Sequence, residues 1–286
     1  KTCASCEKEV DITFAYIAGL AWGSPSNPPV LLCHGKLDSC SGFRPLISLL
    51  PLGFYYVSID LPGNGRSDHL PKGLRYTVVD LVPTLLKVME HFQWKTFRYI
   101  GHSLGVPIGK IFNIAYPGHI SRVVELDPIP AHHTWPTTRE GIHNWYHNYY
   151  GFYNGEKYAK FNGGPETAPK YSYEKVHFPR TVLYENSCFR FTFDQRMKEV
   201  TVLPFSGELL RQIYTTTTTP TFCILAKRVI EDGLYDPVPF LMDPTAWKGL
   251  YRYKVVEGGH DVHIDNPGCM AEDISKFLLE DFNAKL

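Results

Sequence analysis

The pentapeptide Gly101-His102-Ser103-Leu104-Gly105 has the residue types and spacing that point most directly to chemistry. An apolar run, residues 97–100, precedes it, and a helix-like run, residues 106–116, follows it, so the pattern predicts a strand, a tight turn and a helix. Glycines on both sides let the chain and the helix pass close to the serine. A serine in such a turn has strained backbone geometry, and its hydroxyl is lifted out of the sheet edge. We therefore expect Ser103 to act as a nucleophile.

A serine nucleophile needs a base, and His260 is the strongest candidate. It lies in Gly258-Gly259-His260-Asp261-Val262-His263-Ile264, where glycines permit a tight approach after the last predicted strand. His263 is the competing base, and an ordinary surface histidine is its alternative. The two histidines also resemble a metal-ligand pair. No third ligand cluster lies nearby in the sequence, so we expect no metal site.

The base in turn needs a carboxylate that orients it, and three aspartates follow predicted strands. We favour Asp236, which lies in the long loop after residues 222–225 and precedes Pro237-Val238-Pro239. Asp232 is the second candidate and Asp127 the third. The two that are not used are expected to be ordinary loop or helix-capping carboxylates.

An oxyanion next to the serine requires two backbone N–H donors. The N–H of Leu104 is one candidate, because it belongs to the residue after the nucleophile. The other is expected from the loop His34-Gly35-Lys36-Leu37-Asp38, which follows the apolar run 30–33. Within that loop we favour the N–H of Lys36.

Short apolar runs alternate with longer helical patterns and must position these residues. The runs expected to form buried parallel strands are residues 30–33, 55–59, 97–100, 123–126, 222–225 and 251–256. Residues 78–92 place their apolar side chains on one helical face, and residues 10–22 predict an antiparallel hairpin before the sheet. This alternation predicts an α/β fold with a mostly parallel central sheet and helices on both faces.

The alternation breaks between residues 131 and 216, which we interpret as an inserted cap. Residues 1–130 and 217–286 then form the first and second parts of the core. The insertion is rich in tryptophan, tyrosine and phenylalanine between residues 133 and 173, interrupted by glycines. These rings either line a pocket for an apolar substrate or build the core of the cap itself, and both interpretations stay open.

The composition excludes several classes of function. Lys plus Arg equals Asp plus Glu at 29 each, so no electrostatic argument favours nucleic acid or an anionic membrane. No apolar run reaches membrane-spanning length. Cys33 and Cys223 fall in strand-like runs, which suits reduced thiols in an intracellular protein. Ala284-Lys285-Leu286 resembles a peroxisomal address, with an ordinary helix end as the alternative, so the expected location is peroxisomal or cytoplasmic. The chain begins at Lys1, and whether this is the native start stays open.

The motifs together resemble the α/β-hydrolase superfamily over nearly the whole chain. Besides the serine turn, the matching stretches are His34-Gly35, Asp60-Leu61-Pro62-Gly63-Asn64-Gly65-Arg66-Ser67, Asp127-Pro128 and Gly259-His260. Within the superfamily the chain is most similar to the animal serine hydrolase-like proteins. The stretches that carry this likeness are Ala21-Trp22-Gly23-Ser24, Pro28-Pro29-Val30, Phe54-Tyr55-Tyr56-Val57 and Asp194-Gln195-Arg196.

The resemblance implies a Ser–Asp–His hydrolase with an inserted, mainly helical cap and no cofactor. Three positions depart from the common pattern of the superfamily. Asn64 stands where histidine is usual, Val106 where a further glycine is common, and Lys36 where an aromatic residue is more usual.

The favoured function is hydrolysis of a carboxylic ester or thioester of a small apolar substrate through an acyl-enzyme on Ser103. One alternative is a catalytically idle ligand-binding protein of the same fold. Another keeps the three residues but performs C–C bond hydrolysis or a lyase reaction. No member of the expected triad is missing, which favours the enzyme. The acyl group, the leaving group and the oligomeric state are not encoded in any motif that we identify.

Overall fold

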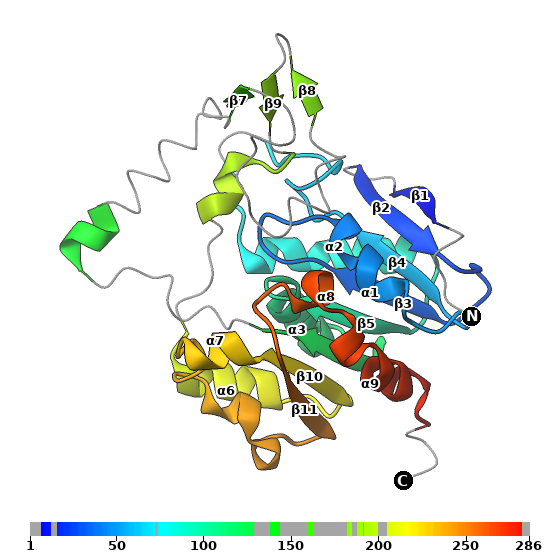
Figure 1. Cartoon of the computed structure of the whole chain (residues 1–286), viewed down its shortest axis with the longest axis vertical. Coiled ribbons are helices and arrows are strands. Elements are labelled where there is room, and N and C mark those ends of the chain that lie inside the picture. The colour runs from blue at the N-terminus through cyan, green and yellow to red at the C-terminus, as the bar shows by residue number, and fades with distance from the viewer. Residues whose placement is uncertain are drawn as a thin grey trace.

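A mostly parallel β-sheet forms the centre of the molecule (Figure 1). The computed structural model describes residues 7–12, 16–71, 74–128, 138–143, 160–162, 182–184, 188–190, 192–199 and 205–281. Within these residues, eight strands form one sheet in the order β1-β2-β4-β3-β5-β6-β10-β11. Their bounds are β1 (Lys8–Ile12), β2 (Ile17–Trp22), β3 (Pro29–Cys33), β4 (Tyr55–Ile59), β5 (Phe97–His102), β6 (Ile120–Leu126), β10 (Thr221–Ala226) and β11 (Tyr251–Val256).

The strand pairing confirms the predicted fold class. β1 and β2 form the expected antiparallel hairpin, and β2 also pairs antiparallel with β4. The pairs from β4 through β3, β5, β6 and β10 to β11 are all parallel. Parallel strands covered on both faces read as continuous apolar runs, which is why these segments were visible in the sequence.

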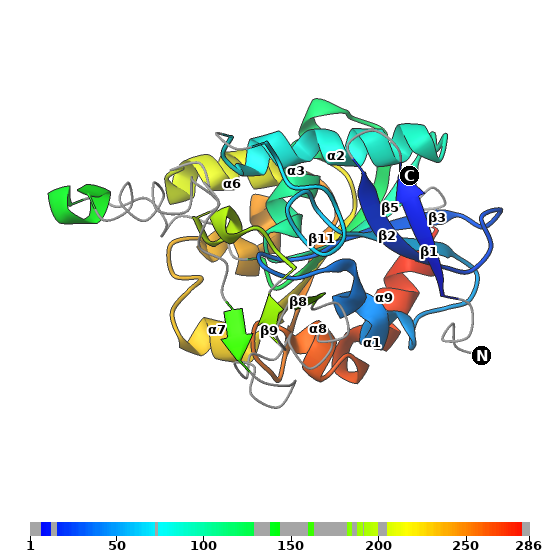
Figure 2. The same ribbon diagram turned by 90° about the horizontal axis from the view of Figure 1, so that it is seen from above.

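Helices cover both faces of the sheet, with α2 (Val78–His91) and α3 (Gly105–Ala115) on one side (Figure 2). On the other side lie α1 (Arg44–Ile47), α8 (Val262–Asp265) and α9 (Gly268–Leu279). The described residues also form the helices α6 (Gly207–Thr215) and α7 (Lys227–Glu231). They contain the 3-10 turns η1 (Cys40–Phe43), η4 (Gln195–Glu199), η5 (Pro239–Met242) and η6 (Pro244–Ala246).

This layering creates two apolar cores, one on each face of the sheet. Alternate side chains of β3 enter opposite cores. Val30 and Leu32 pack into the core under α1 and α9, whereas Leu31 and Cys33 pack into the core under α2 and α3. Successive side chains of a strand point to opposite faces, so one short run serves both cores. Cys33 and Cys223 are buried free thiols, as expected from the sequence.

The segment that the sequence predicts to be an inserted cap, residues 131–216, falls within the connection between β6 and β10. The two strands are parallel neighbours although residues 127–220 separate them. The described part of this connection includes a small antiparallel sheet, β7-β9-β8, formed by β7 (Lys160–Asn162), β9 (Cys188–Arg190) and β8 (Val182–Tyr184). The aromatic side chains expected between residues 133 and 173 lie outside the described part, and the boundaries 131 and 216 stay a prediction.

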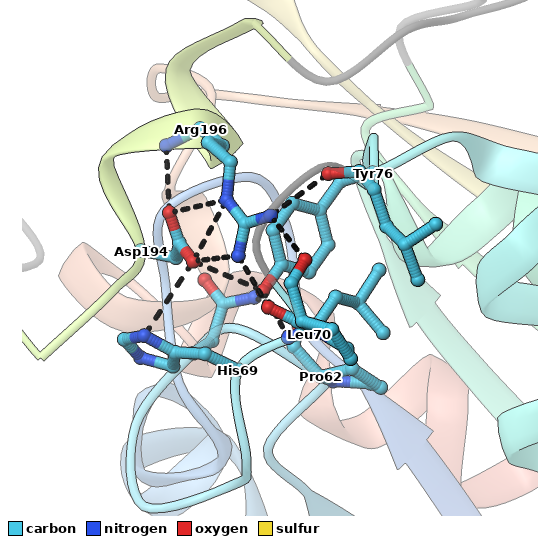
Figure 3. Close-up of polar contacts among 9 residues, drawn as sticks. Pro62, His69, Leu70, Tyr76, Asp194 and Arg196 are labelled. Carbon is cyan, nitrogen blue, oxygen red and sulfur yellow. Dashed lines mark hydrogen bonds and ion pairs between the residues drawn. The ribbon is translucent and has the colours of Figure 1, made fainter. Parts of the chain in front are cut away.

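The described segment 192–199 of this connection is fastened to the core by Arg196 (Figure 3). The guanidinium forms a buried ion pair with Asp194 at 2.7 Å and lies over the ring of Tyr76, 5.1 Å from its centroid. It also donates hydrogen bonds to the backbone carbonyls of Leu70, Pro71 and Leu74. Burial raises the pKa of Asp194, but the hydrogen bonds from Arg196 outweigh burial and hold this pKa below its ordinary value.

Among the described helices, none combines the length and the apolar character needed to cross a lipid bilayer. The C-terminal tripeptide Ala284-Lys285-Leu286 lies outside the described residues.

Candidate active site

Ser103 occupies the turn between β5 and α3, and the predicted strand, turn and helix are confirmed. Its φ is 49°, in the left-handed region that a residue with a side chain rarely adopts. The turn is held from both sides. The Ser103 N–H donates to the Leu126 carbonyl at 3.1 Å, and the Val106 N–H donates to the Ser103 carbonyl at 3.0 Å. The serine is 9% exposed.

The glycine at position 105 is needed for close packing beneath this turn. A Cβ added to Gly105 would lie 2.2 Å from the backbone oxygen of Cys33, a distance that real Cβ atoms do not show. The start of α3 therefore rests directly on the end of β3. This close approach brings the nucleophile turn next to the loop that follows β3.

His260 lies in the loop after β11, and its ring is bound to Asp127. The Nδ1–H of His260 donates to Oδ2 of Asp127 at 2.6 Å. Asp127 follows β6, is fully buried and has a φ of 42°. Its other oxygen, Oδ1, accepts hydrogen bonds from the Ala226 N–H at 2.7 Å and from the Tyr235 hydroxyl at 2.6 Å. The carboxylate is therefore held on both oxygens and fixes the orientation of the imidazole.

The structure corrects the choice of carboxylate. The sequence favoured Asp236, then Asp232, yet the His260 ring is bound to Asp127, the third candidate. Asp232 and Asp236 are both exposed, and Asp236 belongs to a turn in which its N–H donates to the Gly233 carbonyl at 3.2 Å. The long loop after β10 contributes to the site in another way, because it brings the Tyr235 hydroxyl to Asp127. Sequence reasoning missed this tyrosine.

Asp127 also sets the protonation behaviour of His260. Burial lowers the pKa of the imidazole, but the hydrogen bond and the negative charge of Asp127 outweigh burial, so the pKa of His260 is raised above its ordinary value. Because Nδ1–H donates to the carboxylate, the lone pair of the neutral ring is on Nε2. A base with its free nitrogen directed away from the carboxylate is the arrangement that proton abstraction requires.

Ser103 and His260 belong to the same edge of the sheet, the carboxyl ends of β5, β6 and β11. The Ser103 N–H binds the carbonyl of Leu126, the neighbour of Asp127, and the Nε2–H of His102 donates to the His260 carbonyl at 3.0 Å. No hydrogen bond joins the Ser103 hydroxyl to the His260 ring, although both residues are described. Catalytic hydrogen bonds of this kind often tighten only when substrate is bound.

The loop after β3 passes close to the Ser103 side chain. A Cβ added to Gly35 would lie 2.8 Å from Nδ1 of His102 and 3.0 Å from the Ser103 Cβ, so a residue with a side chain would displace the loop or these groups. His34 holds the loop, because its Nδ1–H donates to the Gly35 carbonyl at 2.7 Å and its Nε2 accepts from the Leu61 N–H at 3.0 Å. Lys36 is exposed, and Leu37 has a φ of 64°.

Leu104, the other predicted oxyanion donor, immediately precedes the first residue of α3 and is buried. The first N–H groups of a helix have no partner within the helix and carry partial positive charge. The N–H groups of Leu104 and Lys36 are the oxyanion donors that the sequence predicts. Their roles stay a prediction.

A family model for the alpha/beta hydrolase fold matches residues 28–267 of this chain. A serine hydrolase-like protein of Danio rerio is 29% identical over 295 residues, and the match covers 96% of this chain and 89% of that protein. A solved thioesterase domain from the curacin biosynthetic pathway superposes with a TM-score of 0.74 at 18% identity, covering 94% of this chain and 99% of that one. An esterase of M. tuberculosis superposes with a TM-score of 0.69 at 19% identity, covering 96% of this chain and 92% of that one. With the strand order, the serine turn and this match over most of its length, the chain belongs to the alpha/beta hydrolase family.

Proposed function

We propose that this protein is a serine hydrolase that cleaves carboxylic ester or thioester bonds of a small apolar substrate. The observation that carries the proposal is the bond between His260 and a fully buried Asp127 at the sheet edge where Ser103 occupies a strained turn. The names of the related proteins, serine hydrolase-like, thioesterase and esterase, support the same reaction class.

In the proposed mechanism, Nε2 of His260 accepts the proton of the Ser103 hydroxyl while Oγ attacks the substrate carbonyl carbon. Asp127 stays ionised and stabilises the imidazolium that forms. The N–H groups of Leu104 and Lys36 bind the developing oxyanion, and removal of one such donor costs about 3 kcal/mol of transition-state stabilisation.

Collapse of the tetrahedral intermediate breaks the bond to the leaving alkoxide or thiolate, which accepts from His260 the proton that came from Ser103. The acyl group is then an ester on Ser103. A water molecule repeats the sequence: His260 accepts its proton, the hydroxide oxygen attacks the acyl carbon, and the bond to Oγ breaks. The carboxylic acid leaves, and the serine recovers its proton.

Three finer features belong to the proposal. Residues 131–216 form the cap that covers the substrate, the substrate side chain contacts its aromatic residues, and the protein works without a cofactor. The location in the peroxisome or the cytoplasm also stays a prediction.

A fluorophosphonate probe tests the proposal directly, because it forms a covalent adduct only with an activated serine. The folded protein is labelled, digested and mapped by mass spectrometry, and hydrolysis of short p-nitrophenyl esters and acyl thioesters is measured in parallel. Ser103→Ala is the test variant. Ser121→Ala is the matched control, because Ser121 is exposed at the start of β6, far along the chain from the turn.

The expected result is an adduct on Ser103, with labelling and hydrolysis lost in Ser103→Ala and kept in Ser121→Ala. Labelling without ester or thioester hydrolysis would favour a C–C hydrolase or lyase. A folded wild-type protein that neither labels nor hydrolyses would contradict the proposal and favour an idle ligand-binding protein.

A further inference from the structure

Asp38, His102 and His263 converge in a buried cluster that the proposed hydrolysis does not use. Each residue offers one ligand atom, and these atoms lie within 4.8 Å of one another. Asp38 comes from the loop after β3, His102 from the end of β5, and His263 from α8. The sequence analysis found no third ligand near His263 because the other two residues are distant in the chain and meet only in the fold.

We propose that this cluster is a binding site for a divalent transition-metal ion of the Zn²⁺ class. Two imidazole nitrogens and one carboxylate oxygen are the donor set that zinc accepts. The hard cations Mg²⁺ and Ca²⁺ prefer sites made of oxygen ligands alone. This proposal does not depend on the proposed hydrolase activity, because metal binding is measured directly.

His102 provides the strongest observation. Its Nε2 is 3.0 Å from the His260 carbonyl and donates to it, so the proton of the neutral ring is on Nε2 and the lone pair is on Nδ1. This Nδ1 is buried and accepts no hydrogen bond, and the residue is only 2% exposed. A buried acceptor without a donor is destabilising unless something else occupies its lone pair.

The hydrogen bond of His102 is also the arrangement found around metal ions. A ligating histidine usually donates its other ring N–H to a carboxylate or a backbone carbonyl, which fixes the tautomer and orients the ring toward the metal.

The other two residues complete the donor set. The His263 ring lies against that of His102, with centroids 4.0 Å apart, and is fully buried. The Asp38 carboxylate is oriented by the Ser39 N–H, which donates to Oδ1 at 2.6 Å. Tetrahedral zinc with bonds of about 2.1 Å spaces its ligands by roughly 3.4 Å, so shifts of about 1 Å in the side chains would close the site.

The charges around the cluster suit a cation. Asp38 is itself a ligand, and Oδ1 of Asp261 lies 3.8 Å from Nε2 of His102. The His260 ring lies 4.7 Å from that of His102 between centroids, and a positive charge on it is balanced by Asp127. A bound metal would join the three chain segments that carry Lys36, Ser103 and His260.

The cluster is closed to solvent, so the metal must enter during folding or when these loops open. The protein should therefore be produced in zinc-supplemented medium, freed of any histidine tag, and its zinc content measured per chain. In parallel, protein unfolded with a chelator is refolded with or without Zn²⁺, and thermal unfolding is recorded. We expect about one zinc per chain and a higher melting temperature with zinc, because an ion that binds only the folded state stabilises it.

Two variants and one control test the ligands. Asp38→Asn and His263→Gln keep size and polarity, and each is expected to lower the zinc content at least tenfold and to abolish the zinc-dependent rise in melting temperature. His91→Gln removes an exposed histidine at the end of α2 and is expected to behave as wild type.

X-ray absorption at the zinc edge keeps the proposal testable if the variants fail to fold. On wild-type protein we expect nitrogen and oxygen neighbours with two imidazoles and no sulfur. Sulfur neighbours would instead assign the metal to cysteines such as Cys3 and Cys6. Either sulfur ligation, absence of zinc after refolding with zinc, or folded ligand variants that retain zinc would overturn the proposal.

Discussion

Asparagine in place of Asp127 separates the role of this residue from that of Asp236. Oδ1 of Asp127 accepts from the Ala226 N–H and the Tyr235 hydroxyl, so the amide oxygen of the asparagine must take that position. Its NH₂ group then takes the position of Oδ2, 2.6 Å from Nδ1 of His260. Two donors cannot face each other there, so the ring proton moves to Nε2 and the base loses its lone pair.

The magnitude follows from this change of tautomer. A comparable substitution in a Ser–His–Asp protease lowers kcat about 10⁴-fold, which corresponds to roughly 5.4 kcal/mol in the activation barrier. Stability should change less. Two hydrogen bonds to a charged acceptor become bonds to a neutral one, which costs about 2 kcal/mol in the free energy of unfolding.

The assay is hydrolysis of a p-nitrophenyl ester by Asp127→Asn and by the matched variant Asp236→Asn, with urea unfolding of both. Asp236 is exposed, so its variant should keep the wild-type rate. The reasoning is wrong if folded Asp127→Asn retains more than about a tenth of kcat, or if Asp236→Asn shows the larger loss.

Four further outcomes follow from other contacts. Gly35→Ala should lower kcat/KM about 100-fold with little effect on KM, because the new Cβ would lie 2.8 Å from Nδ1 of His102 and 3.0 Å from the Ser103 Cβ and would displace the loop that carries Lys36. Steady-state kinetics check this. Lys110→Met should lower the free energy of unfolding by about 3–5 kcal/mol, because it leaves the Glu125 carboxylate, 2.7 Å from Nζ of Lys110, buried without a counter-charge. Urea denaturation measures the loss, and a second substitution that neutralises Glu125 should recover most of it. Arg196→Met should cost a similar 3–5 kcal/mol, because Asp194 loses the guanidinium of its buried ion pair and three carbonyls lose their hydrogen-bond donor; an unchanged urea midpoint would contradict this. The pKa of Asp194 is depressed in the folded state. The stabilisation that the ionised carboxylate contributes is therefore complete above its unfolded pKa of about 3.9 and is lost as the pH falls through its lower folded-state pKa. Below about pH 4, the free energy of unfolding of wild type should fall more steeply with pH than that of Asp194→Asn.

The sequence predicted the strands, the serine turn and the histidine loop because each is a local pattern. The run before Ser103 is apolar, the glycines are adjacent, and the helix begins at Gly105. The same holds for the leading hairpin and for α2. The aromatic part of the connection between β6 and β10 has no repeating local pattern of this kind, and its cap stays a prediction.

The partner of His260 could not be predicted in this way, because it depends on which strands are neighbours. Asp127 follows β6, which lies between β5 and β10 in the sheet. The carboxylate therefore meets His260 from the strand beside the nucleophile. Asp236 was favoured because it precedes prolines in a long loop after a strand. In the structure this pattern corresponds to a turn and does not bring the carboxylate to His260. The sequence did not predict the cluster of Asp38, His102 and His263 for a similar reason, because these residues are distant in the chain and meet only in the fold.

Backbone strain shows how the fold holds these residues. Among the described residues, four that are not glycine have a positive φ: Leu37, Gln93, Ser103 and Asp127. Three of the four lie in the loops of the proposed site, where each such conformation costs about 1–3 kcal/mol. Neighbouring strands impose two of them, because the Ser103 N–H binds the Leu126 carbonyl and the Asp127 N–H binds the Ile224 carbonyl at 2.8 Å. The sheet thus holds Ser103 and Asp127 at adjacent strand ends in conformations that neither residue favours alone, so the geometry of the proposed site depends on the parallel pairing of β5, β6 and β10.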